Sequence, residues 1–282
     1  MTLVSIKQQL IQAREAHYAI PLFDVYETQG MDGTMEALVS MRAPTIIGVY
    51  SPFADQPNSH ALAAYIRSRA AETDVPIPLM LDHGASVDLC LKVMDDGYTD
   101  VMYDGSSLPL EENIANTRRV VAAAHARGVA VEAELGHVGM ADEYDAFGGQ
   151  RLGFTDPEVV EYFVGETGVD FLAIAFGNAH GLYKGEPHFD VELVREIRSR
   201  VSVPLVMHGG TGTTDEIFRS LIAAGICKVN YATQILTAAT QAMRVTAADP
   251  TASMFDMLGD IREAYCQSTS HLYEVFGTQN RA

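Results

Sequence analysis

Three histidines, each followed by a glycine and close to the end of a short apolar run, are candidate metal ligands. They lie in the segments LDHG at 81–84, NAHG at 178–181 and MHGG at 207–210. Three imidazoles that converge can bind zinc and leave a coordination position open for catalysis. Any one of them could instead simply end a strand. The prediction of a metal site at His83, His180 and His208 therefore depends on all three together.

Acidic residues occupy the same kind of position. Asp82 directly precedes the first of the three histidines, and Asp24 and Asp104 each end an apolar run. Glu132 and Glu134 are two residues apart on one expected strand, so their side chains face the same way. Two buried acids in one place need compensation by a metal, a histidine or a substrate. Asp24 and Asp104 could alternatively cap the helices that follow them.

The elements that must position these residues alternate regularly between strand and helix. Helical patterns such as Gly30–Met41, Ser59–Glu72, Val87–Asp95 and Leu110–Arg127 separate the expected strands, and Thr233–Arg244 and Ile261–Phe276 follow the last one. The expected strands are Ala19–Val25, Thr45–Tyr50, Ile77–Leu81, Asp100–Tyr103, Ala130–Leu135, Phe171–Ala175, Pro204–Met207 and Cys227–Asn230. This order predicts the α/β class and a (β/α)8 TIM barrel, a single domain over residues 1–282 with a C-terminal helical extension. A doubly wound open sheet is the alternative, but no GxGxxG follows the first strand.

The last two strands lead into turns that suit a phosphate group. HGGTG at 208–212 precedes a helix expected from Thr214, and NYAT at 230–233 precedes one expected from Gln234. In α/β barrels the loops after strands seven and eight commonly bind phosphate at a helix N-terminus. Lys184 could add a fixed positive charge. HGGTG alone could be only a tight turn, so the prediction rests on the pair of motifs.

Composition narrows the choice of partners. The net charge of −18 argues against nucleic acid and against a membrane as partners, because both are anionic. Three scattered cysteines indicate neither a disulfide framework nor a cysteine zinc site. No signal-peptide pattern and no apolar run of spanning length is present, so we expect a cytoplasmic protein.

One connection is much longer than the others. Residues 137–153 read HVGMADEYDAFGGQRLG, which is polar and rich in glycine. Long loops of this kind in compact enzymes commonly close over an active site. The segment is therefore expected to be a mobile lid.

Taken together, the motifs resemble those of the class II aldolases, specifically the fructose/tagatose-bisphosphate aldolase family, from about Ala19 to Ile235. The segments that carry the resemblance are LDH at 81–83, DGS at 104–106, VEAELG at 131–136, TDP at 155–157, AHGLYKGEP at 179–187, HGGTG at 208–212 and KVN at 228–230. The resemblance implies a zinc-dependent aldolase that cleaves a ketose 1-phosphate to dihydroxyacetone phosphate and an aldehyde. Cleavage leaves negative charge on the dihydroxyacetone phosphate half, which a Lewis acid stabilises.

The resemblance also implies roles for individual residues. His83, His180 and His208 would bind Zn²⁺, Asp82 would exchange a proton with the aldehyde oxygen, and Asp104 and Glu134 would match a secondary metal position. The substrate-binding residues would be Asp24, Ser51, Gly181, Lys184, Gly209, Gly210, Thr211, Asn230, Ala232 and Thr233. A monovalent cation, Na⁺ or K⁺, would lie near the phosphate, and the enzyme would be a homodimer or homotetramer.

Three departures from the family pattern bear on the substrate. The family's lid carries Gly-Gly-x-Glu-Asp with the glutamate as the acid that protonates carbon, whereas MADE stands here at 140–143, so Asp142 or Glu143 would take this role. Strand one ends in Phe-Asp rather than Phe-Asn, at Asp24. The Asp-Pro-Arg whose arginine reads a distal phosphate is Asp-Pro-Thr here, ending at Thr251. The last two changes remove a positive charge and add a negative one at the distal end, and they predict an aldehyde half without a phosphate.

Other functions remain open on the sequence. A bisphosphate aldolase proper and a metal-dependent sugar epimerase would use the same scaffold. A zinc hydrolase of the amidohydrolase type is disfavoured because the first strand lacks His-x-His. A phosphosugar-binding protein without catalysis would not need Asp82 and all three histidines.

Overall fold

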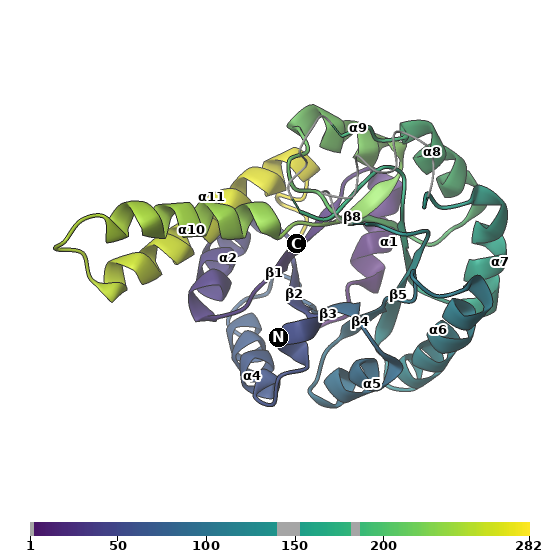
Figure 1. The fold of residues 1–282 in the computed structure, drawn as a ribbon, viewed down its shortest axis with the longest axis horizontal. Coiled ribbons are helices and arrows are strands. Elements are labelled where there is room, and N and C mark those ends of the chain that lie inside the picture. The colour runs from purple at the N-terminus through teal and green to yellow at the C-terminus, as the bar shows by residue number, and fades with distance from the viewer. Residues whose placement is uncertain (1–2, 140–152, 182–186) are drawn as a thin grey trace.

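The computed structural model describes residues 3–139, 153–181 and 187–282, and its centre is a closed barrel of eight parallel strands (Figure 1). The strands are β1 (Ile20–Asp24), β2 (Ile46–Tyr50), β3 (Leu79–Gly84), β4 (Asp100–Tyr103), β5 (Ala130–Leu135), β6 (Phe171–Ile174), β7 (Leu205–Met207) and β8 (Ile226–Asn230). Each pairs with its neighbours in chain order, and β1 also pairs with β8. The predicted TIM barrel is confirmed.

Helices surround the barrel. They are α1 (Lys7–Ala16), α2 (Thr28–Met41), α3 (Ser51–Ala54), α4 (Ser59–Ala70), α5 (Val87–Asp95), α6 (Leu110–His125), α7 (Pro157–Thr167), α8 (Val191–Arg200), α9 (Asp215–Ala224), α10 (Thr233–Ala247) and α11 (Met254–Phe276). Outward side chains of the strands, such as Phe23, Leu81 and Val101, pack against these helices in the larger hydrophobic core. Side chains alternate along each strand, so the remaining residues face the interior of the barrel.

The interior of the barrel changes from apolar to polar along its axis. The lower part holds Leu22, Met80, Met102 and Val206, which belong to a separate core cluster. Two residues further along the same four strands stand Asp24, Asp82, Asp104 and His208. The period of two thus places a polar layer on top of an apolar one, at the carboxyl ends of the strands, where barrel enzymes carry their active sites.

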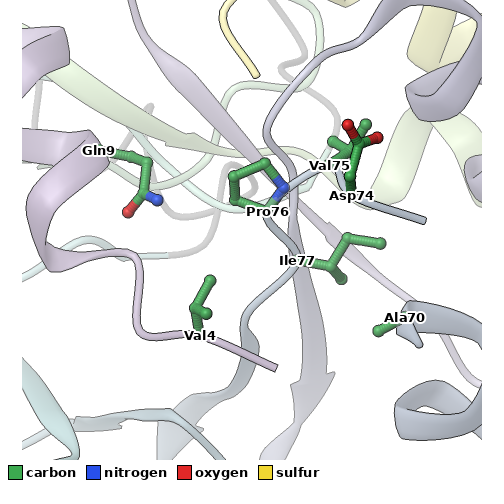
Figure 2. Close-up of a pocket in the computed structure, with 7 residues that line it drawn as sticks. All are labelled: Val4, Gln9, Ala70, Asp74, Val75, Pro76 and Ile77. Carbon is green, nitrogen blue, oxygen red and sulfur yellow. The ribbon is translucent and has the colours of Figure 1, made fainter. Parts of the chain in front are cut away.

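The opposite end is closed by α1. Ile6 and Leu10 are fully buried in the lower cluster, and Asp100 accepts hydrogen bonds from the hydroxyl of Ser5 and the backbone N–H of Ile6. A hollow at this end is lined by Val4, Gln9, Ala70, Asp74, Val75, Pro76 and Ile77 (Figure 2). Its single carboxylate pairs with Arg42. The contacts at this end of the barrel therefore serve to stabilise the fold.

Helices α10 and α11 lie side by side and project from the barrel as an arm (Figure 1). The arm exposes Val245, Met254 and Phe255, with Phe255 83% exposed. Within the described part of the chain, none of the helices combines the length and the apolar composition needed to cross a membrane.

Candidate active site and metal centre

Three histidine rings converge at the barrel mouth from β3, from the residues after β6 and from the residue after β7. The Nε2 atom of His83 lies 3.0 Å from Nε2 of His180 and 2.8 Å from Nδ1 of His208. Two nitrogens bound to one tetrahedral zinc at 2.0–2.1 Å would be about 3.3 Å apart. These two distances are close to that value, and ligand atoms of all three histidines lie within 4.8 Å of one another, so they could bind a single ion.

The other nitrogen of each ring has a partner that fixes the ring. Asp104 Oδ2 lies 2.8 Å from His83 Nδ1, the carbonyl oxygen of Val138 lies 3.1 Å from His180 Nδ1, and Glu132 Oε1 lies 2.8 Å from His208 Nε2. Outer acceptors of this kind hold the proton on the outward nitrogen and leave the inward lone pair for a metal. The donor set fits a divalent ion such as zinc.

His83 reaches this position through an unusual backbone conformation. Its φ is +49°, in the left-handed region that residues other than glycine seldom adopt. The register between β3 and β4 shifts between Leu81 and Gly84, which marks an irregularity at this histidine. Such strain persists where the surrounding structure holds it, and it is commonly found at functional sites.

The charge around the histidines also favours a cation. Burial lowers the pKa of His180 to about 4, helped by the nearby His83, and burial lowers the pKa of His208 well below its ordinary value. Burial alone would also lower the pKa of His83, but Asp82 and Asp104 raise it to about 10. Neutral imidazoles are the form that binds metal.

Glu134 completes a second acidic group next to the first. Burial, followed by the charge of Asp104, raises its pKa to about 8. Its Oε1 accepts from the N–H of Val138, whereas its buried Oε2 has no hydrogen-bond partner among the described residues. His83, Asp104 and Glu134 offer ligand atoms within 4.8 Å of one another, as do the three histidines. A buried carboxylate oxygen without a partner suits a cation.

Asp82 and Asp24 lie together beside this centre, at the ends of β3 and β1. Asn230 on β8 donates from Nδ2 to Asp82 Oδ1 at 2.6 Å. Burial and the neighbouring Asp82 raise the pKa of Asp24 well above its ordinary value. Gly48 leaves room for Asp24, because a Cβ at Gly48 would lie 2.6 Å from Asp24 Oδ1. Neither Asp24 nor Asp104 caps the helix that follows it; the cap of α2 is Glu27.

A buried lysine lies below Asn230. Lys228 is fully buried and donates to Asn230 Oδ1 at 2.6 Å. Its Nζ atom is also 2.9 Å from Glu132 Oε2. The register between β7 and β8 shifts after the pair of Leu205 and Ile226. Lys228 and Asn230 are two residues apart on β8, so their side chains face the same way.

The glycine turn after β7 and the start of α10 lie next to one another. The N–H of Gly212 donates to the side chain of Gln234 at 3.4 Å, which links the two segments. Gly209 has φ +70°, and a Cβ there would meet the carbonyl oxygen of Ala179 at 2.1 Å. Only glycine fits this close approach. Thr211 is buried in the turn, and Thr233 begins α10.

Aromatic rings border the mouth on the side of β1 and β2. The Tyr50 ring meets the His83 ring edge-on with centroids 6.3 Å apart, and the rings of Tyr26 and Phe53 are 4.5 Å apart. Tyr50 and Phe53 are each 40% exposed. After burial, the carboxylates of Asp82, Asp24 and Asp104 raise the pKa of Tyr50. The electrostatic potential on this side of the mouth is thus negative.

Comparison with known proteins agrees with this geometry. The family model described as fructose-bisphosphate aldolase class-II matches residues 4–281. The chain belongs to the class II fructose-bisphosphate aldolase family. It is therefore a class II aldolase, a metal-dependent lyase.

Individual members of the family match over their whole length. The fructose-bisphosphate aldolase of Staphylococcus aureus strain Mu50 is 35% identical over 288 residues, covering 100% of both chains. That of Geobacillus stearothermophilus is 36% identical, covering 100% of this chain and 99% of the relative. The crystal structure of the YdjI aldolase from Escherichia coli K12 superimposes with a TM-score of 0.89 at 31% identity, covering 99% of each chain.

The structure brings most of the sequence-predicted residues of this class II aldolase to one end of the barrel. Ser51 is buried there and accepts a hydrogen bond from the N–H of Ala85. Asp142, Glu143 and Lys184 lie outside the described residues, as does most of the expected lid.

Thr251 requires a correction. It was expected near the distal end of the substrate, but it lies between α10 and α11, at the end of the arm (Figure 1). The 15 residues of α10 span about 22 Å at 1.5 Å per residue. Thr251 therefore does not line the mouth of its own barrel, and the missing arginine matters only where the arm of another copy reaches this site.

Sequence reasoning did not predict a role for Lys228 or Tyr50. The KVN motif carries the family resemblance as a whole, but a single lysine within an expected strand gives no sign that it is buried. Tyr50 ended an expected strand next to Ser51, and its alternation with Gly48 was the available signal.

Proposed function

We propose that this enzyme is a zinc-dependent aldolase that cleaves a ketose 1-phosphate into dihydroxyacetone phosphate and an aldehyde without a phosphate. The observation that carries the proposal is the convergence of three histidine nitrogens beside the buried pair Asp24 and Asp82. Bound zinc would act as a Lewis acid that stabilises charge on the oxygens of the dihydroxyacetone phosphate half.

In this proposal His83, His180 and His208 hold the zinc, and Asp104 and Glu134 form the secondary metal position. Asp82 takes the proton of the C4 hydroxyl as the C3–C4 bond breaks and returns it in the synthetic direction. Asp142 or Glu143 protonates the carbon that loses the aldehyde. The proximity of Asp82 to the histidines supports the first of these proton transfers.

The phosphate of the ketose would bind at the turn Gly209–Thr211 and at the start of α10, with Gly181, Lys184, Asn230 and Ala232 contacting the same half of the substrate. Backbone N–H groups at a glycine turn and a helix N-terminus attract an anion. The barrel mouth is otherwise acidic, so we propose that a monovalent cation, Na⁺ or K⁺, binds near the phosphate.

The aldehyde half would lie on the opposite side, against Asp24, Ser51 and Tyr50. Three carboxylates raise the pKa of Tyr50, so a second phosphate there would meet negative charge. Hydroxyl groups of a sugar chain can donate to carboxylates, and its C–H groups can lie against the aromatic rings. These features support an uncharged polyhydroxy aldehyde.

We also propose that the chain assembles as a homodimer or homotetramer in the cytoplasm. The support for assembly is the arm, whose apolar residues Met254 and Phe255 are 69% and 83% exposed. Exposed apolar residues that cluster on a projecting element commonly mark a protein contact.

The test is a panel of phosphosugars. The zinc-loaded enzyme is incubated with fructose 1-phosphate, tagatose 1-phosphate and the two matching 1,6-bisphosphates, and release of dihydroxyacetone phosphate is measured. The monophosphates are expected to have the higher kcat/KM. Asp24→Asn, which restores the residue usual in the family, is expected to raise the ratio in favour of the bisphosphates. A wide preference of the unmodified enzyme for a bisphosphate would contradict the proposal.

A further inference from the structure

A continuous chain of polar contacts crosses the interior of the barrel beneath the proposed catalytic centre. It runs from His208 to Glu132 at 2.8 Å, from Glu132 to Lys228 at 2.9 Å, from Lys228 to Asn230 at 2.6 Å and from Asn230 to Asp82 at 2.6 Å. Lys228 is its middle member. Four strands, β7, β5, β8 and β3, contribute to it or lead directly into it.

The chemistry of the side chains determines which group donates and which accepts in the contacts of Asn230. An ammonium group can only donate, so the atom of Asn230 that faces Lys228 must be the carbonyl oxygen Oδ1. The amide nitrogen Nδ2 then points the other way, toward Asp82, and donates to Oδ1 of that carboxylate. Without the lysine, the amide of Asn230 would keep its hydrogen bond to Asp82 but would lose the donor that holds its oxygen, so its position would be less well fixed.

Lys228 is costly to keep in this place. It is fully buried, and an isolated ammonium in the interior of a protein loses its hydration. Glu132, also fully buried, offsets the charge. A buried ion pair of this kind is commonly no more stable than apolar residues of the same size. Its presence beside the reacting centre therefore calls for a role other than stability.

We propose that Lys228 is a positioning residue, which fixes the orientation of the Asn230 amide so that Asp82 is held in the geometry that accepts the proton of the C4 hydroxyl. This inference rests on the role proposed for Asp82. Glu132 serves as the counter-charge of Lys228 and as the outer acceptor of His208, so the same carboxylate supports both the metal ligand and the acid.

The test separates positioning from charge balance by removing both charges together. Lys228→Met alone leaves the buried Glu132 without its counter-charge, and the protein is expected to lose stability for that reason alone. The informative pair is Glu132→Gln and the double variant Glu132→Gln/Lys228→Met, because both lack the buried carboxylate and the double variant also lacks the ammonium. Zinc content and the thermal unfolding temperature are measured for each, so that kcat is compared only between folded, loaded enzymes.

The double variant is expected to fold and bind zinc like Glu132→Gln, with kcat about 10-fold or more below it and KM changed by less than about 3-fold. Equal kcat values in the two variants would overturn the proposal, because Lys228 would then only balance Glu132. The same comparison in an Asn230→Ala background should show no further loss, since the group to be positioned is absent. An equal loss in that background would also overturn the proposal.

A readout independent of catalysis uses the metal-free protein. The side-chain amide protons of Asn230, identified by their loss in Asn230→Ala, should exchange with solvent at least 10-fold faster in the double variant than in Glu132→Gln. Unchanged exchange would mean that Lys228 does not hold the amide. If exchange changes and kcat does not, Lys228 orders the amide without serving the reaction, and the proposal fails. The role of Asp82 is tested separately by measuring kcat of Asp82→Asn. A wrong role for Asp82 can therefore be distinguished from a wrong role for Lys228.

Discussion

The carboxylate of Asp104 lies 2.8 Å from Nδ1 of His83, on the side of the ring away from His180 and His208. This contact holds a ring whose backbone is in the left-handed region, so the strand irregularity and the carboxylate act on the same ligand. Ser106 in turn donates from its hydroxyl to Asp104 Oδ1 at 2.7 Å. The orientation of His83 is thus fixed by residues that directly follow the neighbouring strand β4.

Asp104→Asn is expected to weaken zinc binding by about 10- to 100-fold, the effect commonly seen when the outer partner of a metal-binding histidine is lost. The measurement is competition with a chelator of known affinity, followed by zinc content. Asp88→Asn, in the first turn of α5, is the control. An affinity equal to that of the unmodified enzyme would show that His83 needs no such support.

Asp82→Asn is expected to retain zinc and the fold while cleavage falls by about 10²- to 10⁴-fold, the usual contribution of a general acid–base group. An amide has the same shape as the carboxylate but cannot accept the proton. Steady-state cleavage of a ketose 1-phosphate by zinc-loaded protein measures the effect. Near-normal turnover would remove Asp82 from the proposed mechanism.

Asp142→Ala or Glu143→Ala is expected to slow exchange of the C3 proton of dihydroxyacetone phosphate with deuterated solvent. The exchange reports only the proton transfer at carbon, so it separates these residues from Asp82. Nuclear magnetic resonance follows the loss of the proton signal. If both variants exchange at the normal rate, another residue protonates the carbon.

Asp100, below the barrel, predicts a pH dependence of stability. Burial raises its pKa to about 7, against the opposing hydrogen bonds from Ser5 and Thr99. Its folded pKa lies above the unfolded value of about 3.9, so the folded state binds the proton more tightly and loses stability as pH rises from about 4 to 7. Asp100→Asn should therefore gain stability relative to the unmodified protein over this range.

The measurement for Asp100→Asn is the urea midpoint of zinc-saturated protein at pH 5, 6, 7 and 8. Asp74→Asn is the control: Asp74 is exposed, and its hydrogen bond and ion pair with Arg42 lower its pKa, so it stays ionised throughout and its effect should be constant with pH. A constant difference between Asp100→Asn and the unmodified protein would contradict the prediction.

The double substitution Met254→Ser/Phe255→Ser is expected to shift the enzyme toward the monomer, because it removes the most exposed apolar residues of the arm. Sedimentation velocity over a range of protein concentrations measures the change. Tyr162→Ser on α7, which is 47% exposed outside the arm, is the control. An unmodified protein that is monomeric at all concentrations would contradict the proposed assembly.

Much of this architecture could be predicted because each strand carries its own signal. Apolar residues followed by a polar residue two positions later recur in β1, β3, β4 and β7, and this pattern alone places Asp24, Asp82, Asp104 and His208 in one layer. The bounds of β4 and β5 match the expected ones, and the other six strands differ from theirs by one to three residues at one or both ends. The convergence of the histidines follows from the closed barrel, in which all strands end at one mouth.

The remaining features depend on contacts between distant segments. Lys228 shares a side of β8 with Asn230 by simple alternation, but its ion pair with Glu132 of β5 forms across the barrel, and a sequence pattern does not show it. The helix α1 was not among the expected elements, because only Leu10 and Ala13 of its ten residues are buried. Thr251 lies at the end of the arm, away from the barrel. A sequence motif does not show the direction in which a long helix leaves the barrel, so this position could not be predicted.

The pairing of β1 with β8 also bears on how the protein is made. Ile20 pairs with Lys228 in this seam, whereas Leu22 pairs with Ile46 in the seam between β1 and β2. A nascent chain emerging from the ribosome can therefore assemble the other seams in order, but the first strand must keep an unpaired edge until the eighth is synthesised. Lys228 and Asn230 belong to that eighth strand. Closing the barrel and completing the polar layer thus happen in one step. A truncated translation product that ends between His208 and β8 would carry all three histidines but would form neither the β1–β8 pairing nor the complete site.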